Sequence, residues 1–183
     1  GDAHRFTTEL SSLLTTCGVE FLYGVSAKEL LFNGDRVSGI TTSNGTLKGD
    51  AVVVSAAVDS VRLLKPAYSR IPIYPIKGYS ITVATSGYSG APNISVHDHE
   101  RKIGFTSLGD RLRAAGTAEL GAREKAPSKS RIEELRKQTQ TMFPAAGDFE
   151  SAEPWAGFRP MTPDGVPIVS KTKYKNLFVN TGH

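Results

Sequence analysis

The feature that most constrains the fold is a change in the character of the sequence near Ile71. From there to about residue 120, runs of β-forming residues are separated by prolines and glycines, a pattern typical of antiparallel strands joined by turns. The candidate strands are Tyr79–Ala84, Ile94–Val96, Ile103–Leu108 and Leu112–Ala118. The middle of the chain is therefore predicted to form an antiparallel sheet.

The residues before this region predict a helix followed by short strands. An amphipathic helix is expected to begin after Asp2, which is suited to capping it, and to end at Gly18. Strands are predicted at Val19–Leu22 and Val25–Phe32, and an Asn-Gly pair at residues 44 and 45 predicts a hairpin. The apolar face of the helix consists of Phe6, Leu10, Leu13, Leu14 and Cys17.

Three further elements are predicted on either side of the sheet. Ala51–Ser55 is apolar along both faces, which is typical of a strand buried between two layers, and a short helix should cover Val58–Leu64. Ser130 and Glu133 have the spacing of a capping box. A long helix is therefore predicted to begin near Ser130 and to end before Pro144.

The end of the chain returns to short strands. After a passage rich in glycine and proline between residues 155 and 165, buried strands are predicted at Val166–Val169 and Leu177–Asn180. The order of the elements predicts a mixed α+β and α/β fold of two partial domains. Residues 1–70 and 156–183 are expected to form one domain, and residues 71–155 the antiparallel sheet with its helix.

The composition is that of a globular protein and argues against several functions. The net charge is +4, but Lys and Arg are scattered singly, which does not favour a nucleic-acid partner. Cys17 is the only cysteine, so an internal disulfide and a cysteine-rich zinc site are excluded. His97 and His99 lack the further ligands that a metal site needs, and no metal site is predicted.

Neither a membrane-spanning helix nor an N-terminal signal peptide is predicted. No apolar stretch approaches the roughly 20 residues that a membrane-spanning helix needs, and Gly1–Arg5 lacks the order of basic and apolar residues of a signal peptide. The chain begins without methionine inside a helical pattern and stops directly after a predicted strand. We therefore expect both ends to continue in a longer protein.

One segment near the C-terminus is the strongest candidate for a ligand site. In residues 155–169, which read WAGFRPMTPDGVPIV, Arg159 lies between a Gly-Phe step and a proline. A guanidinium held on such a stiff backbone is suited to bind a carboxylate through two hydrogen bonds. The alternative is a structural arginine that pairs with a neighbouring acid or stacks on Trp155.

The same segment carries a resemblance to a known family. GFRPMTPDGVPIV, followed by NLFVNTGH, resembles the D-amino-acid oxidase, glycine oxidase and D-amino-acid dehydrogenase superfamily of FAD enzymes. Three other stretches agree with it, namely GDAHRFTTEL at 1–10, PIYPIKGYSITV at 72–83 and RLRAAGTAEL at 111–120. The likeness is greatest to the small subunit of bacterial D-amino-acid dehydrogenases and runs in order over nearly the whole chain.

The resemblance implies roles for individual residues. Arg159 corresponds to the arginine that binds the substrate carboxylate. Val25 corresponds to a position whose backbone pairs with the adenine of FAD. Ser55, Ala56 and Ala57 correspond to a turn that passes the FAD phosphates and ribityl chain, where the family commonly has glycine in place of Ala57.

Two more segments are implied to lie near the flavin. Gly78 would permit close approach to the ring, Lys77 would add positive charge, and Tyr79 would line the substrate pocket. Gly182 and His183 correspond to the start of a Gly-His-Gly segment whose backbone amides approach the flavin. The alternatives are a plain strand residue at Val25, packing of the small residues after the buried strand, and a sheet glycine with a solvated lysine at residues 77 and 78.

The function implied by the resemblance is the oxidative deamination of D-amino acids to 2-oxo acids and ammonia, with hydride transfer from Cα to FAD. Two alternatives are amine oxidation of the glycine or sarcosine oxidase kind and a non-redox module that binds small carboxylates. The resemblance implies a cytoplasmic protein, or one attached peripherally to the inner face of the bacterial membrane. The preferred substrate and the electron acceptor are not indicated.

The resemblance also implies that residues 1–70 and 156–183 are parts of an FAD-binding domain and residues 71–155 a substrate-binding domain. The Gly-x-Gly-x-x-Gly fingerprint that holds the pyrophosphate of a dinucleotide is absent from the sequence. A missing N-terminal FAD-binding segment is therefore expected as the partner of this chain. Alone, the chain is expected to be colourless and inactive.

Overall fold

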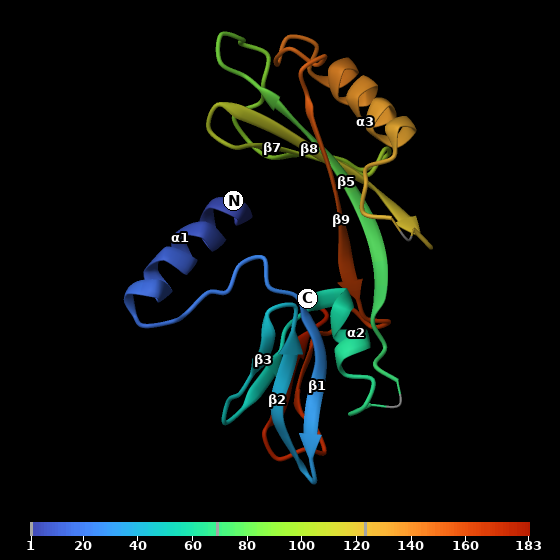
Figure 1. The fold of residues 1–183 in the computed structure, drawn as a ribbon. Helices are drawn as coiled ribbons and strands as arrows, with labels where there is room; N and C mark the ends of the chain where they lie inside the picture. Colours follow the sequence, from blue (N-terminus) through green and yellow to red (C-terminus); the bar gives the residue numbers. More distant parts are fainter. Residues whose placement is uncertain (1, 69, 123) are drawn as a thin grey trace. The chain divides into compact units, whose positions relative to one another are not determined.

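The computed structural model describes residues 2–68, 70–122 and 124–183. The chain divides into two compact units, which are drawn in Figure 1. Unit 1 combines residues 1–74 and 160–183, and unit 2 comprises residues 75–159. The mixed class with antiparallel sheets is confirmed, and we describe each unit separately.

Unit 1 opens with helix α1, Ala3–Thr16. Its start is capped as predicted, because the Asp2 carboxylate accepts a hydrogen bond of 3.0 Å from the backbone N–H of Arg5. Gly18 follows with a φ of +88°, a conformation that favours glycine and ends the helix. No residue of α1 is buried.

The strand predicted at Val19–Leu22 is wrong. These residues are irregular, and none of the sheets described for the chain includes them. An extended run becomes a strand only where a neighbouring strand satisfies its backbone groups, so the apolar sequence alone was insufficient. The next prediction is confirmed, with β1 formed by Ala27–Asn33.

The first sheet of unit 1 has the order β1-β2-β3, with β2 formed by Arg36–Thr42 and β3 by Gly45–Leu47. The hairpin predicted at residues 44 and 45 joins β2 to β3. Buried Asn176 anchors this sheet, because it accepts from the Val37 N–H at 2.8 Å and donates to the Val37 carbonyl at 2.9 Å. One side chain from the end of the chain therefore fixes the position of β2.

The second sheet of unit 1 has the order β10-β11-β4. Strand β4 is Val52–Val54, β10 is Ile168–Lys171 and β11 is Leu177–Thr181, and β4 runs parallel to β11. Val53 is 61% exposed, so burial of this strand on both faces is a wrong prediction. Only the face that carries Val54 is covered by other described residues.

The predicted short helix of unit 1 is present in two parts, a 3-10 turn η1 at Ala57–Asp59 and helix α2 at Ser60–Leu63. Behind the second sheet lies an apolar core. Its most deeply buried members are Leu30, Val37, Leu64, Leu177 and Val179.

Unit 2 contains the antiparallel sheet, in the order β6-β7-β8-β5-β9. Its strands are β5 at Tyr74–Ala84, β6 at Val96–Asp98, β7 at Ile103–Ser107, β8 at Arg111–Leu120 and β9 at Glu153–Met161. The sequence missed β9, because Gly157 and Pro160 gave this segment the pattern of a loop. Proline is tolerated there because β9 is an edge strand.

Helix α3, Lys129–Met142, covers one face of this sheet (Figure 1). The predicted capping box is wrong: Ser128 is the N-cap residue and makes no side-chain capping bond, while its hydroxyl lies 3.1 Å from that of Ser130. Leu135 and Thr139 are the buried residues of the helix. The core beneath includes an edge-to-face pair of aromatic rings, Phe105 and Phe143, 5.1 Å apart.

The described residues contain neither a membrane-spanning helix nor a cluster of metal-binding side chains. None of their helices is long and apolar enough to cross a membrane. Within the same ranges, no group of three or more His, Cys, Asp or Glu residues is arranged to hold a metal ion.

Candidate functional site

The first candidate site lies at one edge of the second sheet of unit 1. Strands β4 and β11 are parallel neighbours, with Val54 paired to Val179, so both carboxyl ends meet at this edge. The turn Ser55–Ala57 follows β4, and Gly182 follows β11. Ligands of open α/β sheets bind outside the carboxyl ends of the strands. The structure thus brings together two segments that the sequence placed 125 residues apart, since Ala57 and Gly182 are separated by that number of positions.

Buried hydroxyl groups tie these two segments to each other. Ser60 accepts a hydrogen bond from the Ala56 N–H at 3.1 Å and donates to the Thr181 hydroxyl at 3.2 Å. Thr181 in turn donates to the carbonyl of Ala57 at 3.2 Å. Ser60 and Thr181 are both buried, which makes the connection independent of solvent. Neither residue could be singled out from the sequence, because an ordinary serine or threonine carries no pattern that marks it.

Ala57 itself has a φ of +49°, in the left-handed region that favours glycine. This backbone geometry explains why a glycine suits the position. Alanine replaces the glycine expected at position 57, but the backbone keeps the left-handed conformation that a glycine would adopt. The exposed side chain of Ala57 still leaves the surrounding backbone open to close approach.

Val25 and His183 complete the residues assigned to cofactor binding in unit 1. Val25 is half-buried and lies two residues before β1. The start of β1 is tied to α2, because the Arg62 guanidinium donates to the carbonyl groups of Ala27, at 2.8 Å, and Lys28. Among the described residues, no hydrogen bond joins Val25 to the turn after β4, and His183 is exposed.

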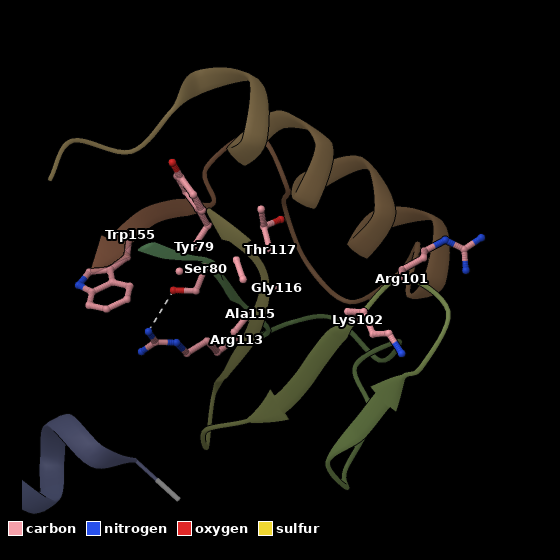
Figure 2. A pocket seen from close by; sticks show the side chains of 11 residues that line it. Tyr79, Ser80, Arg101, Lys102, Arg113, Ala115, Gly116, Thr117 and Trp155 are labelled. Carbon is pink, nitrogen blue, oxygen red and sulfur yellow. Dashed lines mark hydrogen bonds between the residues drawn. The ribbon is translucent and has the colours of Figure 1, made fainter. Parts of the chain in front are cut away.

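The second candidate site is a pocket of about 640 Å³ on the sheet of unit 2 (Figure 2). It lies over β5 and β8, with Trp155 contributed by β9. A Cβ atom built on Gly78 would meet no other atom within 4 Å, so the glycine leaves open space above the sheet. The lining residues used below are Gly78, Ser80, Lys102, Arg113, Thr117 and Trp155.

Arg113 is held in place by two neighbours in this pocket. Its Nη2 donates to the Ser80 hydroxyl at 3.0 Å, and its Cζ lies 5.2 Å from the centre of the Trp155 ring (Figure 2). Trp155 therefore stacks with Arg113, and no stacking of Arg159 on Trp155 is found among the described residues. Arg113 and Ser80 were not predicted as site residues, because they become neighbours only through the register of β5 and β8.

Lys77 and Tyr79 are engaged within unit 2. Lys77 is buried, and its Nζ donates to the Ala126 carbonyl at 2.7 Å and lies 5.2 Å from the Tyr79 ring centre. Tyr79 is buried in the core, and its hydroxyl donates to the Glu119 carboxylate. Side chains alternate between the two faces of a strand, so Gly78 opens to the face opposite these two residues.

Arg159 is exposed and lies near the end of β9. Within residues 2–68, 70–122 and 124–183, its side chain makes no hydrogen bond, ion pair or ring contact. The alternative of an arginine locked to an internal acid is therefore not found among these residues. Its guanidinium keeps its donors free for an external carboxylate.

Charge in the pocket of unit 2 is unevenly neutralised. Arg101 lies beside Asp98, with 2.9 Å between Nη1 and Oδ2. The backbone N–H and guanidinium of Arg101 hold the pKa of the Asp98 carboxyl below its usual value. The charges of Arg101 and Asp98 therefore neutralise each other. Lys102 and Arg113, in contrast, form no ion pair with a described acid.

The family model for FAD dependent oxidoreductases, named DAO, matches residues 1–183. The chain belongs to this family. A D-amino acid dehydrogenase of Paramagnetospirillum magneticum is 48% identical over 183 residues, which are 100% of this chain and 43% of that protein. A D-amino acid dehydrogenase of Methylobacterium radiotolerans is 45% identical over 184 residues, covering 100% of this chain and 44% of that protein. The resemblance inferred from the sequence is confirmed, and the chain spans less than half the length of these DAO relatives.

Solved structures show that the fold is that of other DAO-like enzymes. L-proline dehydrogenase from P. horikoshii superimposes with a TM-score of 0.82 at 19% identity, covering 100% of this chain and 50% of that one. Glycine oxidase from Bacillus cereus gives a TM-score of 0.72 at 22% identity, covering 87% of this chain and 44% of that one. At these identities the likeness concerns the fold alone.

Proposed function

We propose that this chain supplies the substrate-binding sheet and part of the FAD site of a D-amino acid dehydrogenase. The observation that carries the proposal is Arg159, an exposed guanidinium on a sheet strand whose donors are not used by any described acid. Support comes from the relative of Paramagnetospirillum magneticum, which is 48% identical and bears that name. Arg159 binds the substrate carboxylate through two charged hydrogen bonds.

The residues present fit an FAD group in two respects. Gly78 leaves space over the sheet of unit 2 that any larger side chain would enter. The edge formed by β4 and β11 has small residues, Ala56 and Ala57, where a phosphate chain must pass close to the backbone. Ser55, Gly182 and His183 flank the same edge, and the backbone of Val25 is assigned to the adenine. When bound, FAD supplies the hydride acceptor.

The roles of the remaining residues concern positioning. Arg159 orients the amino acid so that its Cα–H bond faces the acceptor, and alignment of this kind is a large part of catalysis by such enzymes. Lys77 adds a buried positive charge beside Gly78. Tyr79 borders the pocket, while its hydroxyl is engaged by Glu119 within the core. Loss of the hydride converts the amino acid into an imino acid, which water hydrolyses to a 2-oxo acid and ammonia.

The experiment that tests this function joins the chain to the part of the Paramagnetospirillum magneticum relative that lies outside the match. We expect the joined protein to be yellow and to oxidise D-amino acids with an artificial electron acceptor. Arg159→Ala should raise KM at least about tenfold, because two charged hydrogen bonds are lost. Lys137→Ala, at an exposed position of α3, is the matched control that removes a positive charge elsewhere.

The substrate panel separates this proposal from its alternatives. Turnover of glycine or sarcosine with oxygen, in preference to D-amino acids, would indicate an amine oxidase. Binding of small carboxylates without any reduction of the acceptor would indicate a non-redox module. The chain by itself, mixed with FAD and passed through a desalting column, is expected to retain no flavin absorbance, since it lacks the glycine-rich fingerprint.

A further inference from the structure

The pocket of unit 2 contains a cation that the proposed function does not use. Arg113 is half-buried on β8 and forms no ion pair with any acid in the described ranges. Buried or half-buried arginines usually have an acidic partner, because removing a charge from water is costly. Arg113 therefore lacks a counter-charge within the described part of the molecule.

The position of Arg113 is nevertheless well defined. Ser80 accepts a hydrogen bond from Nη2 at 3.0 Å, which leaves the other guanidinium donors available. The Trp155 ring lies 5.2 Å from Cζ, within the range of a cation–π contact. Gly157 makes this arrangement possible, because a Cβ at that position would overlap the Trp155 indole. Two side chains and one glycine thus hold a single guanidinium ready for a ligand.

The electrostatic character of the pocket is positive. Its described lining includes Arg101, Lys102 and Arg113 but no Asp or Glu. Arg101 is neutralised by Asp98, and Figure 2 shows Arg101 and Lys102 on the side of the pocket away from Trp155. The unneutralised charge beside the aromatic wall is therefore that of Arg113. Trp155 is 53% exposed, so its ring offers surface to a bound molecule.

We propose that Arg113, with Ser80 and Trp155, forms a second anion subsite that binds the carboxylate of a small organic acid. This inference rests on the proposed function for its biological meaning: the subsite receives the side-chain carboxylate of an acidic D-amino acid, while Arg159 binds the α-carboxylate. Trp155 and Arg159 lie four residues apart on β9, roughly 13 Å between Cα atoms. That spacing leaves room for a substrate between the two guanidinium groups.

Trp155 provides a direct readout, because it is the only tryptophan of the chain. We would titrate the chain with D-glutamate, D-glutamine and glutarate and follow tryptophan fluorescence, with calorimetry as a second measurement. D-glutamate and glutarate should give a saturable change. D-glutamine should bind at least about tenfold more weakly, because it replaces the charged acceptor by a neutral one. Equal binding of D-glutamate and D-glutamine would overturn the proposal.

Three substitutions locate the binding. Arg113→Gln should weaken D-glutamate binding at least about tenfold, and Arg113→Lys should lose part of that affinity because lysine lacks the planar fork. Lys137→Gln should leave it unchanged. Circular dichroism checks that each variant is folded. If Arg113→Gln unfolds, the loss of affinity is measured on Arg113→Lys instead. If Arg159→Gln abolishes discrimination against D-glutamine and Arg113→Gln does not, the subsite is assigned to the wrong arginine.

This titration needs neither FAD nor turnover, so it fails independently of the proposed function. If binding is saturable and depends on Arg113 but the joined protein is inactive, the anion subsite is supported and the dehydrogenase function is rejected. If the joined protein oxidises D-amino acids without preferring the acidic ones, and no fluorescence change depends on Arg113, the dehydrogenase function is supported and the subsite is rejected.

Discussion

The two long helices of the chain are both 14 residues long and have opposite surroundings. Helix α1 has a clear apolar face and a correctly predicted cap, yet it buries no residue, and Phe6 is 66% exposed. Helix α3 is the more polar sequence and lacks its predicted cap, yet Leu135 and Thr139 are fully covered. Local signals therefore decided where each helix forms, while burial depended on whether a partner surface was present.

The largest expected difference comes from the same substitution made in each helix. Leu135→Ala in α3 should lower the free energy of unfolding by about 2–5 kcal/mol, because it empties a packed site. Leu13→Ala in α1 should change it by less than about 0.5 kcal/mol, because Leu13 is 59% exposed. Urea denaturation followed by circular dichroism and by Trp155 fluorescence measures both. Similar losses in the two variants would remove the contrast between the helices.

A smaller effect is expected at the turn after β4. Ala57→Gly should raise the free energy of unfolding by up to about 1 kcal/mol, because alanine pays for its left-handed φ and glycine does not. Ala56→Gly is the matched control, and it should destabilise by about 0.5–1 kcal/mol because the φ of Ala56 is −98°. Hydrogen exchange of the Val54 and Val179 amides reports on unit 1. A loss of protection in Ala57→Gly would contradict the strained turn.

The ion pairs of α3 should add a weak dependence on pH. Hydrogen bonding from Arg136 lowers the pKa of the Glu133 carboxyl from its usual value of about 4.5. A group whose pKa is lower in the folded state stabilises the fold above its unfolded pKa. The contribution is therefore present at neutral pH and is lost as the pH falls below about 4.5 and through the lowered pKa.

Measuring the unfolding midpoint in urea between neutral and acid pH tests this contribution. Arg136→Gln should flatten the part of the profile that Glu133 causes, and Lys137→Gln should flatten it less, since Lys137 lies 3.6 Å from the same carboxylate. The effect is small because Glu133 and Glu150 are exposed. An unchanged acid profile in Arg136→Gln would show that this pair does not contribute.

The smallest effect on stability is expected from α1. Phe6→Ser should leave the unfolding midpoint unchanged and reduce the fluorescence of a dye that binds exposed apolar surface. Such dyes respond to an uncovered apolar face whether or not that face contributes to folding. Leu135→Ser in α3 provides the opposite control, with a large loss of stability. Loss of stability in Phe6→Ser would show that α1 is covered in solution.

Candidate site residues could be named from the sequence, although their arrangement could not. The segment around Arg159 was predicted to be a ligand site from its stiff backbone, and only the family resemblance is confirmed, by the match over residues 1–183. Arg113 and Ser80 were missed, because they become neighbours only through the register that pairs β5 with β8. The roles of all the proposed site residues remain predictions, namely Val25, Ser55, Ala56, Ala57, Lys77, Gly78, Tyr79, Arg159, Gly182 and His183.

The sequence by itself determined the family, the positions of most helices and strands, and the turns at glycine, because these depend on short-range backbone preferences and local patterns. Tertiary structure alone decided that β9 is an edge strand, that Val19–Leu22 is irregular and that α1 remains uncovered. It also joined the ends of β4 and β11 through Ser60 and Thr181. The physical reason is that strand pairing and burial depend on partners far away in the chain, which no local pattern specifies.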